Sequence, residues 1–556
     1  MVSTTEPIGA GTRISLVNRW SVATVCLAII LVGPILSVFH AATGDNEGLW
    51  QHLSDTVLPG YVANTLVLMA GVGSVSLLFG VSAAWTVTRY DFFGRGALEW
   101  MLLLPAAVPA YIVAYTYTDF LEYAGPVQGA LRALFGWQSA RDYWFPEIRS
   151  MGGAILVMGS VLYPYVYMMA RTAFKLTPHS LFEIARIHDR NLFWQVGMPM
   201  ARPAIVAGLA LVLMETISDF GTVEYFAVHT LTLGIFNVWL GMNNLPAAAQ
   251  IASLSFLFVI ALLVLEFYAR SRRRYTDTSR RAVSFVPVRV SSGRSAACFA
   301  ICMLPVTVGF VVPVAVLLHF VLRGYAATDY AAIASVALNS VTVALSVAVM
   351  VMSVAGFMVF VATYRASAFL KTLTALCSTG YAFPGTILAI GVVTFAGAVD
   401  HAAGTLVGRA TGMSFDGFLS GTIWLVLLAC MVRFQAVGYG AVASGIGRLP
   451  PNMMNASRVL GRSFPQSLRE VVLPLLRSSF LAGGMLVFVD VMKELPMTLL
   501  LRPFNFETLA TYVYQFAKDE LLEDAALPAL FVVLAGIGPV ILMNAALRRI
   551  GQKKQA

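Results

Sequence analysis

The most regular feature of this chain is the alternation of long apolar runs with short charged segments. A helix that crosses a bilayer needs roughly 20 mostly apolar residues, and about twelve windows meet that requirement. They lie near residues 20–40, 61–88, 97–118, 152–174, 203–226, 247–268, 296–322, 338–363, 372–397, 417–440, 478–501 and 526–547. The pattern therefore predicts an all-α polytopic membrane protein with about twelve transmembrane helices.

The first window follows Arg13 and Arg19 and is long enough to cross a membrane, so it is interpreted as an uncleaved span. A cleaved signal peptide ending near Ala41 and Ala42 is the alternative. Removing this window would leave the two halves of the chain with unequal numbers of spans, which favours the first interpretation.

Short motifs recur 275 positions apart, which indicates an internal duplication. The recurring pairs are Asn64-Thr65 with Asn339-Ser340, Pro109 with Pro384, and Gly208 with Gly483. We expect a first half at 1–269, a basic cytoplasmic linker at 270–295 and a second half at 296–556. Because each half holds an even number of predicted spans, both halves enter the membrane from the same side, so two parallel six-helix repeats are predicted.

Composition supports the membrane assignment, because 58% of the residues are hydrophobic, only 12% are charged and the mean hydropathy is +0.77. The net charge of +9 could suggest nucleic acid, but the basic residues gather in loops on one predicted side: Arg89 and Arg95; Arg171 to Arg190; Arg270 to Arg294; Arg365 and Lys371; Arg433 to Arg469; Arg548 to Lys554. Positive-inside topology explains this distribution and predicts that both termini are cytoplasmic. The five cysteines lack paired spacing, so neither a disulfide nor a metal site is assigned to them.

Two charged, helix-forming islands interrupt the apolar pattern, at 183–203 and 455–477, and both are predicted on the cytoplasmic side. Each ends in a proline followed three residues later by an arginine, and these positions are again 275 apart. A single island could be an ordinary interfacial helix, but two at matching places favour docking surfaces for a partner. The candidate docking residues are Glu183, Ala185, Arg186, Pro199, Arg202, Asn455, Ala456, Ser457, Arg458, Gly461, Pro474 and Arg477. The prolines are expected to break the helices and turn the chain toward the next span.

A set of acidic residues follows each island. Glu215 and Asp219 are one helical turn apart, and Asp490 and Glu494 stand 275 positions later. Carboxylates near or inside spans commonly line a polar path, and oxygen ligands favour hard cations, so these four and Glu224 are predicted to form a translocation path without a tightly bound metal. The alternative is that they pair with Arg477, Lys493 or Arg502.

No phosphate-cradling GxxxxGK[ST] loop and no metalloprotease or hydrolase motif occurs in the sequence, so the chain is not expected to be an enzyme. Any energy for active transport must come from a separate subunit or from an ion gradient.

Both islands resemble the cytoplasmic EAA loop of binding-protein-dependent ABC importer permeases. They depart from the family pattern in having Asn455 in place of Glu and Asp189 in place of Gly. The stretches 218–226, 232–236, 490–498 and 502–510 resemble the iron(III) permeases of that family. This resemblance implies a bacterial inner-membrane permease for iron(III), which receives its cargo from a periplasmic iron-binding protein and is surrounded by membrane lipid.

The resemblance also implies two ABC ATPase subunits that use the ATP, with no cofactor held by this chain. Permeases for thiamine, phosphonate or polyamine are the alternatives within the class. An ion-coupled secondary transporter with parallel repeats is the alternative outside it.

Overall fold

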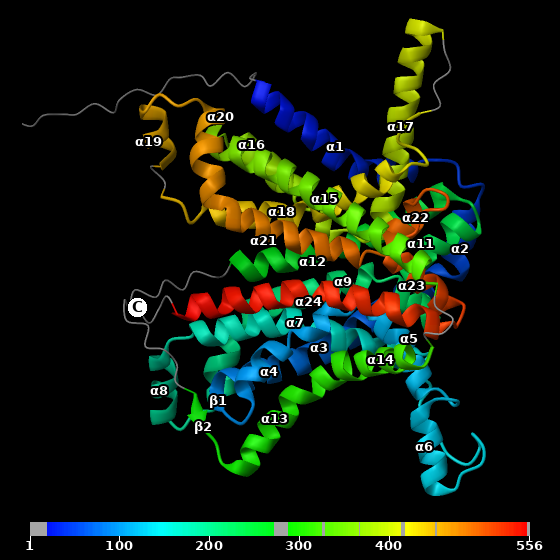
Figure 1. The fold of residues 1–556 in the computed structure, drawn as a ribbon, viewed down its shortest axis with the longest axis vertical. Helices are drawn as coiled ribbons and strands as arrows, with labels where there is room; N and C mark the ends of the chain where they lie inside the picture. Colours follow the sequence, from blue (N-terminus) through cyan, green and yellow to red (C-terminus); the bar gives the residue numbers. More distant parts are fainter. Residues whose placement is uncertain are drawn as a thin grey trace, which may run out of the picture.

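The computed structural model describes residues 19–271, 287–324, 329–365, 367–412, 417–450 and 453–552. Within these ranges the regular secondary structure is helical except for one two-residue parallel pairing (Figure 1). Residues 272–286 of the predicted basic linker, and the terminal residues 1–18 and 553–556, lie outside the described residues.

The first part of the chain contains α1 (Arg19–Ala41), α2 (Leu49–Thr56), α3 (Leu58–Arg89), β1 (Tyr90–Asp91), α4 (Arg95–Met101), the 3₁₀ turn η1 (Leu104–Ala107), α5 (Ala110–Leu121), α6 (Pro126–Phe135), α7 (Met151–Leu176), α8 (His179–Ile187), the π turn η2 (Phe193–Gly197), α9 (Met198–Ser218), α10 (Gly221–Tyr225), α11 (Leu231–Phe236), the π turn η3 (Asn237–Gly241) and α12 (Leu245–Ser271).

The second part contains β2 (Val288–Arg289), α13 (Ser292–Val306), the π turn η4 (Thr307–Val311), α14 (Val312–Gly324), α15 (Tyr330–Arg365), α16 (Ala368–Cys377), the 3₁₀ turn η5 (Gly380–Ala382), α17 (Gly385–Thr411), α18 (Ile423–Ile446), α19 (Met453–Val459), α20 (Phe464–Ser467), the π turn η6 (Leu468–Val472), α21 (Leu473–Met492), α22 (Pro496–Leu501), α23 (Leu509–Lys518) and α24 (Leu522–Gln552).

Ten helices of the described residues are long and apolar enough to cross a membrane. An eleventh candidate is the pair Arg95–Ala107 and Ala110–Phe135, which is bent by 93°. That pair corresponds to the predicted window 97–118, so this window is not one straight helix. The window 526–547 falls in α24, which is not among the ten. The structure therefore gives an all-helical polytopic membrane protein with ten or eleven candidate spans.

Many elements recur at the predicted spacing. The π turns η2 and η6 begin at Phe193 and Leu468, which are 275 positions apart. Pro109 precedes α5 and Pro384 precedes α17 as the N-cap residue in each case. The two short helices α10 and α22 begin at Gly221 and Pro496, again 275 apart.

The sequence pairs at this spacing also make equivalent contacts. Asn64 donates its side-chain amide to the carbonyl of His229 at 3.0 Å, and Asn339 donates to the carbonyl of Glu507 at 3.1 Å. The neighbouring hydroxyls accept the N–H groups at the starts of α11 and α23, where Thr65 bonds Leu231 and Ser340 bonds Leu509. These bonds satisfy backbone donors that a helix N-terminus otherwise leaves without a partner.

The first helix of each part packs on the other part. Helix α1 lies against α15, α16 and α17, while α13 lies against α3 and α14 lies against α5; α14 also packs on α24 of its own part. Gly391 of α17 allows the closest approach, because a Cβ there would lie 2.0 Å from the carbonyl oxygen of Pro34 in α1. With Ala28 and Leu31 buried, α1 is an integral part of the packed helices.

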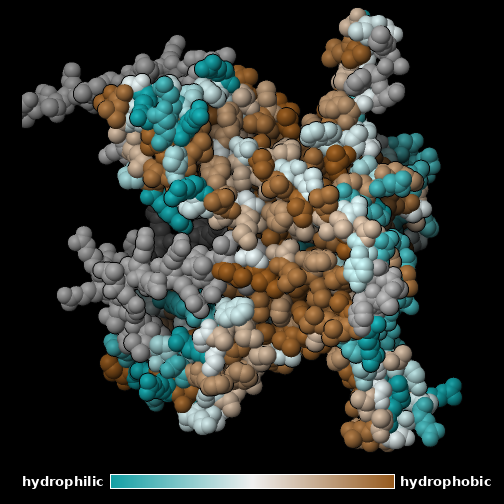
Figure 2. All heavy atoms as spheres, in the orientation of Figure 1, coloured by the Kyte–Doolittle hydropathy of each residue, from teal (hydrophilic) through white to brown (hydrophobic). Residues whose placement is uncertain are grey.

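The two ends of the molecule differ in character. Helices α8 and α19 lie at one end, on opposite sides of the molecule (Figure 1). Helices α2, α6 and α11, and the outer part of α17, lie at the other end. Between them the surface is mainly apolar, as expected for helices that face lipid (Figure 2).

Candidate functional site

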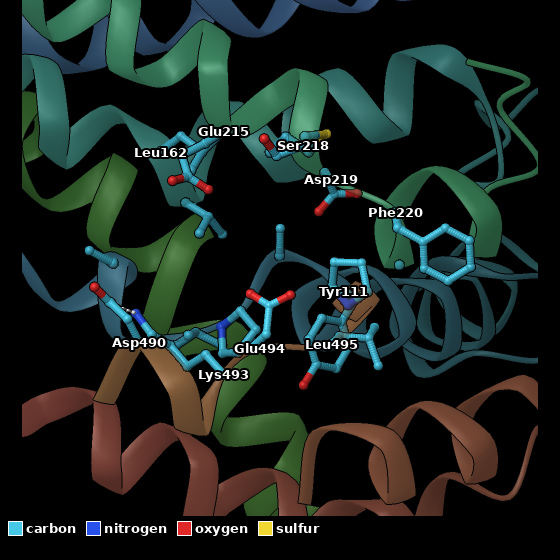
Figure 3. Close-up of a pocket in the computed structure, with 18 of the residues that line it drawn as sticks. Tyr111, Leu162, Glu215, Ser218, Asp219, Phe220, Asp490, Lys493, Glu494 and Leu495 are labelled. Atoms are coloured by element: carbon cyan, nitrogen blue, oxygen red, sulfur yellow. Dashed lines mark ion pairs between the residues drawn. The ribbon is translucent and has the colours of Figure 1, made fainter. Parts of the chain in front are cut away.

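The four repeat-related carboxylates line one cavity of about 150 Å³. Glu215 and Asp219 reach it from α9 and the residue that follows it, and Asp490 and Glu494 reach it from α21 and the loop before α22. Figure 3 shows the two pairs on opposite walls, with Asp219 and Glu494 turned toward one another. Helices far apart in the sequence therefore bring together the acidic residues that the spacing of 275 predicted.

Two cations share this cavity. Arg433 of α18 pairs with Glu494 at 3.0 Å between Nη1 and Oε2, and both side chains are almost fully buried. Lys493 lies 3.5 Å from Asp490, and both of these side chains are partly exposed. The lining residues thus carry four formal negative charges against two positive ones, which leaves the cavity with a formal charge of −2 (−4 + 2).

The carboxylates also hold the local backbone. Asp219 accepts the N–H groups of Thr222 and Val223 at 2.9 and 3.2 Å, and its second oxygen accepts the Thr222 hydroxyl at 3.0 Å. Glu494 accepts the N–H of Met497 at 3.1 Å, 275 positions later. Each acid therefore caps the short helix that follows it, because the first N–H groups of a helix have no partner within it.

Glu215 connects the two parts of the chain. Its Oε1 accepts a hydrogen bond from the Tyr381 hydroxyl in η5 at 2.8 Å. Tyr111 and Tyr165 line the same cavity. Among the described residues, no three His, Cys, Asp or Glu side chains come together as a set of metal ligands. In this conformation the carboxylates therefore lie on opposite walls of the cavity and do not surround one point.

Sequence reasoning missed Arg433 and Tyr381. Arg433 was counted with the basic residues of a cytoplasmic loop, but the structure places it inside α18 with 6% of its surface exposed. That assignment was wrong, because this guanidinium is held within the helix bundle by Glu494 rather than by water. The available signal was an arginine inside the predicted window 417–440, since ionisable residues within apolar segments commonly serve a function.

The alternative pairing of the acids is correct only in part. Lys493 pairs with Asp490, whereas Arg502 pairs with Glu507 at 2.5 Å and Arg477 is exposed.

Glu224 does not line this cavity. It lies on α10 and pairs with Lys518 of α23 at 3.0 Å, and it also accepts a hydrogen bond from the Tyr514 hydroxyl. Burial and the neighbouring Glu224 carboxylate raise the pKa of Tyr514, which keeps the hydroxyl protonated as a donor. Arg149 makes a second connection between the two parts of the chain, because it forms ion pairs with Glu122 at 2.7 Å and with Glu520 at 2.8 Å. These contacts form an outer clamp, defined by Glu224, Tyr514, Lys518, Arg149 and Glu520, that joins the two parts of the chain.

The first predicted docking island begins in α8 and continues through η2 into the start of α9. Glu183 and Arg186 are exposed on α8, while Ala185 is buried. Phe182 anchors the helix, because its ring is 2% exposed and packs against Trp85 of α3 with 6.2 Å between ring centroids. This anchor provides a direct mechanical connection from α8 to a long helix, and the sequence reasoning did not identify it.

The second island begins in α19 and continues through α20 and η6 into the start of α21. Ala456 is exposed, and Ser457 is buried with its hydroxyl 2.7 Å from that of Ser467. The side chains of Asn455 and Arg458 lie outside the described set. Arg202 and Arg477, in the first turns of α9 and α21, are both exposed.

The structure explains why Asp189 can stand where the EAA-loop pattern has Gly. This residue adopts a left-handed conformation with φ of 50°, and Gly461 has φ of 76° at the matching place after α19. In both turns an N–H returns to a carbonyl five residues earlier, from Arg190 to Ala185 at 2.8 Å and from Arg462 to Ser457 at 3.2 Å. Asp tolerates the left-handed region better than most residues, so it can replace Gly in this helix-ending turn.

The prediction that the prolines of the islands break the helices is wrong. Pro199 and Pro474 lie in the first turns of α9 and α21, which continue directly from the π turns η2 and η6. A π turn rearranges the local hydrogen bonds, so the missing N–H of proline does not end the helix. The chain reverses earlier, at Asp189 and Gly461.

These features define a class: a polytopic helical membrane protein with a charged cavity between its halves and two short helices at one end. Residues 76–275 match the family described as "Binding-protein-dependent transport system inner membrane component". This match covers 200 of the 556 residues (275 − 76 + 1), and over them the chain is similar to multi-pass inner-membrane permease components, which are not enzymes.

Two relatives are similar over different lengths. The Fe(3+)-transport system permease protein FbpB 2 of Haemophilus influenzae is 23% identical over 533 residues, covering 93% of this chain and 97% of that protein. The molybdate/tungstate transport system permease protein WtpB of Thermococcus kodakarensis is 26% identical over 249 residues, covering 43% of this chain and 92% of that protein. The ferric permease thus matches both halves of this chain, whereas WtpB has about the length of one.

Proposed function

We propose that this chain is the permease subunit of an ATP-driven importer that moves ferric iron from a periplasmic binding protein into the cytoplasm. The observation that carries the proposal is the single cavity lined by four repeat-related carboxylates, with a formal charge of −2. Oxygen ligands suit a hard, highly charged cation. The similarity to a ferric permease over 93% of the chain supports the same cargo.

The proposed architecture is two parallel halves of six spans each, related by an axis along the membrane normal. In this arrangement α8, α19 and both termini of the chain face the cytoplasm. Helices α8 and α19 each receive one ATPase subunit. The binding protein approaches the opposite end, where the outer clamp joins the halves. Recurrence of helices, turns and hydrogen bonds at a spacing of 275 supports the two halves.

Transport would follow from rigid-body motion of the halves. ATP-driven approach of the two ATPases moves α8 and α19 together, and Phe182 transmits this motion to α3. Opening of the outer clamp then admits the cation to the acidic cavity. Because the carboxylates lie on opposite walls and do not enclose one point, the cavity passes the ion on without holding it tightly.

The test is uptake of radioactive ferric iron into proteoliposomes that contain this chain, its ATPase and its binding protein. We expect uptake only when ATP is present on the ATPase side. Parallel reactions use thiamine, a phosphonate, a polyamine and molybdate, each with its own binding protein. Uptake of one of these in place of iron would overturn the cargo, and uptake driven by an ion gradient without the ATPase would overturn the class.

Docking is tested separately with Glu183→Trp and Ala456→Trp, which enlarge exposed positions on α8 and α19. We expect each variant to lose ATPase association. Ala130→Trp enlarges an exposed position on α6 at the other end and is the matched control. Retained association in both docking variants, with normal uptake, would contradict the proposed docking surface.

A further inference from the structure

Two arms project sideways from the end of the molecule opposite α8 and α19. The α6 arm (residues 122–150) contains α6 and its returning segment, and the α17 arm (residues 397–412) is the outer part of α17. In Figure 1 both arms extend outward, across the direction of the long helices, in opposite directions. Both helices end at a left-handed glycine, α6 at Gly136 and α17 at Gly412, each with φ of 71°.

The polar side of α6 is turned into its own arm. Gln128 donates to the carbonyl of Leu121 at 2.7 Å and accepts from the Tyr143 hydroxyl at 2.5 Å. Arg132 donates to the carbonyl of Tyr123 at 2.7 Å and to the Tyr143 hydroxyl at 3.1 Å. With its polar groups satisfied internally, the helix presents its other side outward.

That outward side is apolar. Leu134 is 75% exposed and Phe135 is 58% exposed, although a helix in water normally hides such side chains. Phe135 stacks on Trp137, which in turn stacks on Tyr143, with ring centroids 4.7 and 4.6 Å apart. Trp144, the next residue, is 85% exposed. Stacked and exposed aromatic rings of this kind are enriched where membrane meets water.

The α17 arm has the same character. Leu406 is 67% exposed and shares one helical face with Ala403, Val407 and Ala410, while His401, Thr405 and Arg409 occupy the other. The base of the arm is fixed by Asp400, whose carboxylate accepts the N–H groups of Phe418, Leu419 and Ser420 at 3.0, 3.2 and 2.8 Å.

We propose that the two arms are interfacial helices that lie in the headgroup layer of the outer leaflet, with their apolar sides toward the acyl chains. The geometry carries this assignment, because the arms extend beyond the long helices and so lie above the surrounding lipid. Figure 2 shows the α6 arm with apolar atoms at its tip and toward the apolar band, and with most of its polar atoms on the side away from the band. A binding protein over the centre of this end would not cover that apolar side.

The charges of the α6 arm indicate which lipids are sufficient for its attachment to the membrane. The acids Glu122, Asp142 and Glu147 balance Arg132, Arg141 and Arg149, so residues 122–150 have no net charge. Attachment therefore depends on burial of apolar surface rather than on anionic lipid. The choice of the outer leaflet rests on the orientation given in the proposed function, whereas the interfacial position of the arms requires only that the chain spans a membrane and does not depend on the proposed cargo.

Site-directed spin labelling of the full chain in zwitterionic phosphatidylcholine vesicles tests the proposal. Of the five cysteines only Cys26 is exposed, so labels are introduced at Leu134→Cys or Leu406→Cys in a Cys26→Ala background. We expect both labels to be accessible to molecular oxygen and protected from a water-soluble nickel chelate. Arg141→Cys, an exposed position on the returning segment, is the matched control and should be open to nickel.

Nickel access at Leu134→Cys and Leu406→Cys equal to that of the control would overturn the proposal. Protection that arises only after the purified binding protein is added would also overturn it and would assign the arms to protein docking. Protection that requires added anionic lipid would refute the dependence on apolar burial. Iron uptake plays no part in these readouts, so failure here is distinguishable from failure of the proposed function.

Discussion

Replacement of Arg433 by Met should destabilise the chain far more than loss of an ordinary ion pair. The guanidinium and the Glu494 carboxylate are 3.0 Å apart, and their side chains are 8% and 5% exposed. At this separation, an effective dielectric constant of about 20 gives an attraction of about 5 kcal/mol, much of which offsets the loss of hydration. Arg433→Met leaves Glu494 buried without its counter-charge, which typically costs about 3–5 kcal/mol.

The double variant Arg433→Met with Glu494→Gln should recover most of this loss. Removal of both charges leaves no unpaired ion, and the Gln carbonyl can still accept the N–H of Met497. The coupling energy between the two positions should therefore be about 2–4 kcal/mol. Lys493→Met is the matched control, because the Lys493 and Asp490 side chains are more exposed and 3.5 Å apart, so its cost should be about 1 kcal/mol or less.

The assay is reversible unfolding of the purified chain in mixed detergent micelles, with the free energy of unfolding compared among the wild type, both single variants, the double variant and the control. The reasoning is refuted if Arg433→Met costs less than about 1 kcal/mol, or if the effects of the two single changes simply add.

Three further changes test other parts of the structure. Gly391→Ala would place a Cβ 2.0 Å from a backbone carbonyl of α1 and should lower the free energy of unfolding by about 1–3 kcal/mol. Gly397→Ala is the control and should not lower it, because no other atom lies within 4 Å of where its Cβ would be. Equal losses in the two variants would contradict the close packing of α1. Lys518→Met removes a half-exposed partner of Glu224 in the outer clamp and should raise the rate of ATP hydrolysis by the assembled importer. The increase should be at most about fivefold, because such ion pairs contribute about 1 kcal/mol or less. A lowered rate of hydrolysis would argue against a clamp. Gly461→Ala forces a side chain into φ of 76° and should cost about 1–2 kcal/mol in unfolding titrations; an unchanged midpoint would refute the turn.

Patterns that depend on local sequence predicted much of this molecule. The apolar windows matched most of the long helices because a span must satisfy its own backbone hydrogen bonds within one continuous segment. The spacing of 275 identified hydroxyl and amide pairs that prove to hold equivalent helix starts, such as Thr65 and Ser340. The docking role of α8 and α19 stays a prediction.

Other features could not be derived from local pattern. The proline positions were misjudged because a π turn depends on the packing around it, not on proline alone. Glu224 was grouped with the cavity acids because it follows them closely in the sequence, but helix α10 directs it to Lys518. The bend of 93° between the α4 and α5 segments is likewise invisible in the apolar pattern of window 97–118.

The sequence by itself determined that the chain is an all-helical membrane protein, that it carries repeated motifs and that acids recur at a fixed spacing, because composition and periodicity act within single helices. Only the tertiary structure decided that these acids share one cavity and that Arg433 joins them. It also decided that α1 packs on the second half. Those facts depend on contacts between segments far apart in the chain, where geometry rather than local preference selects the partner.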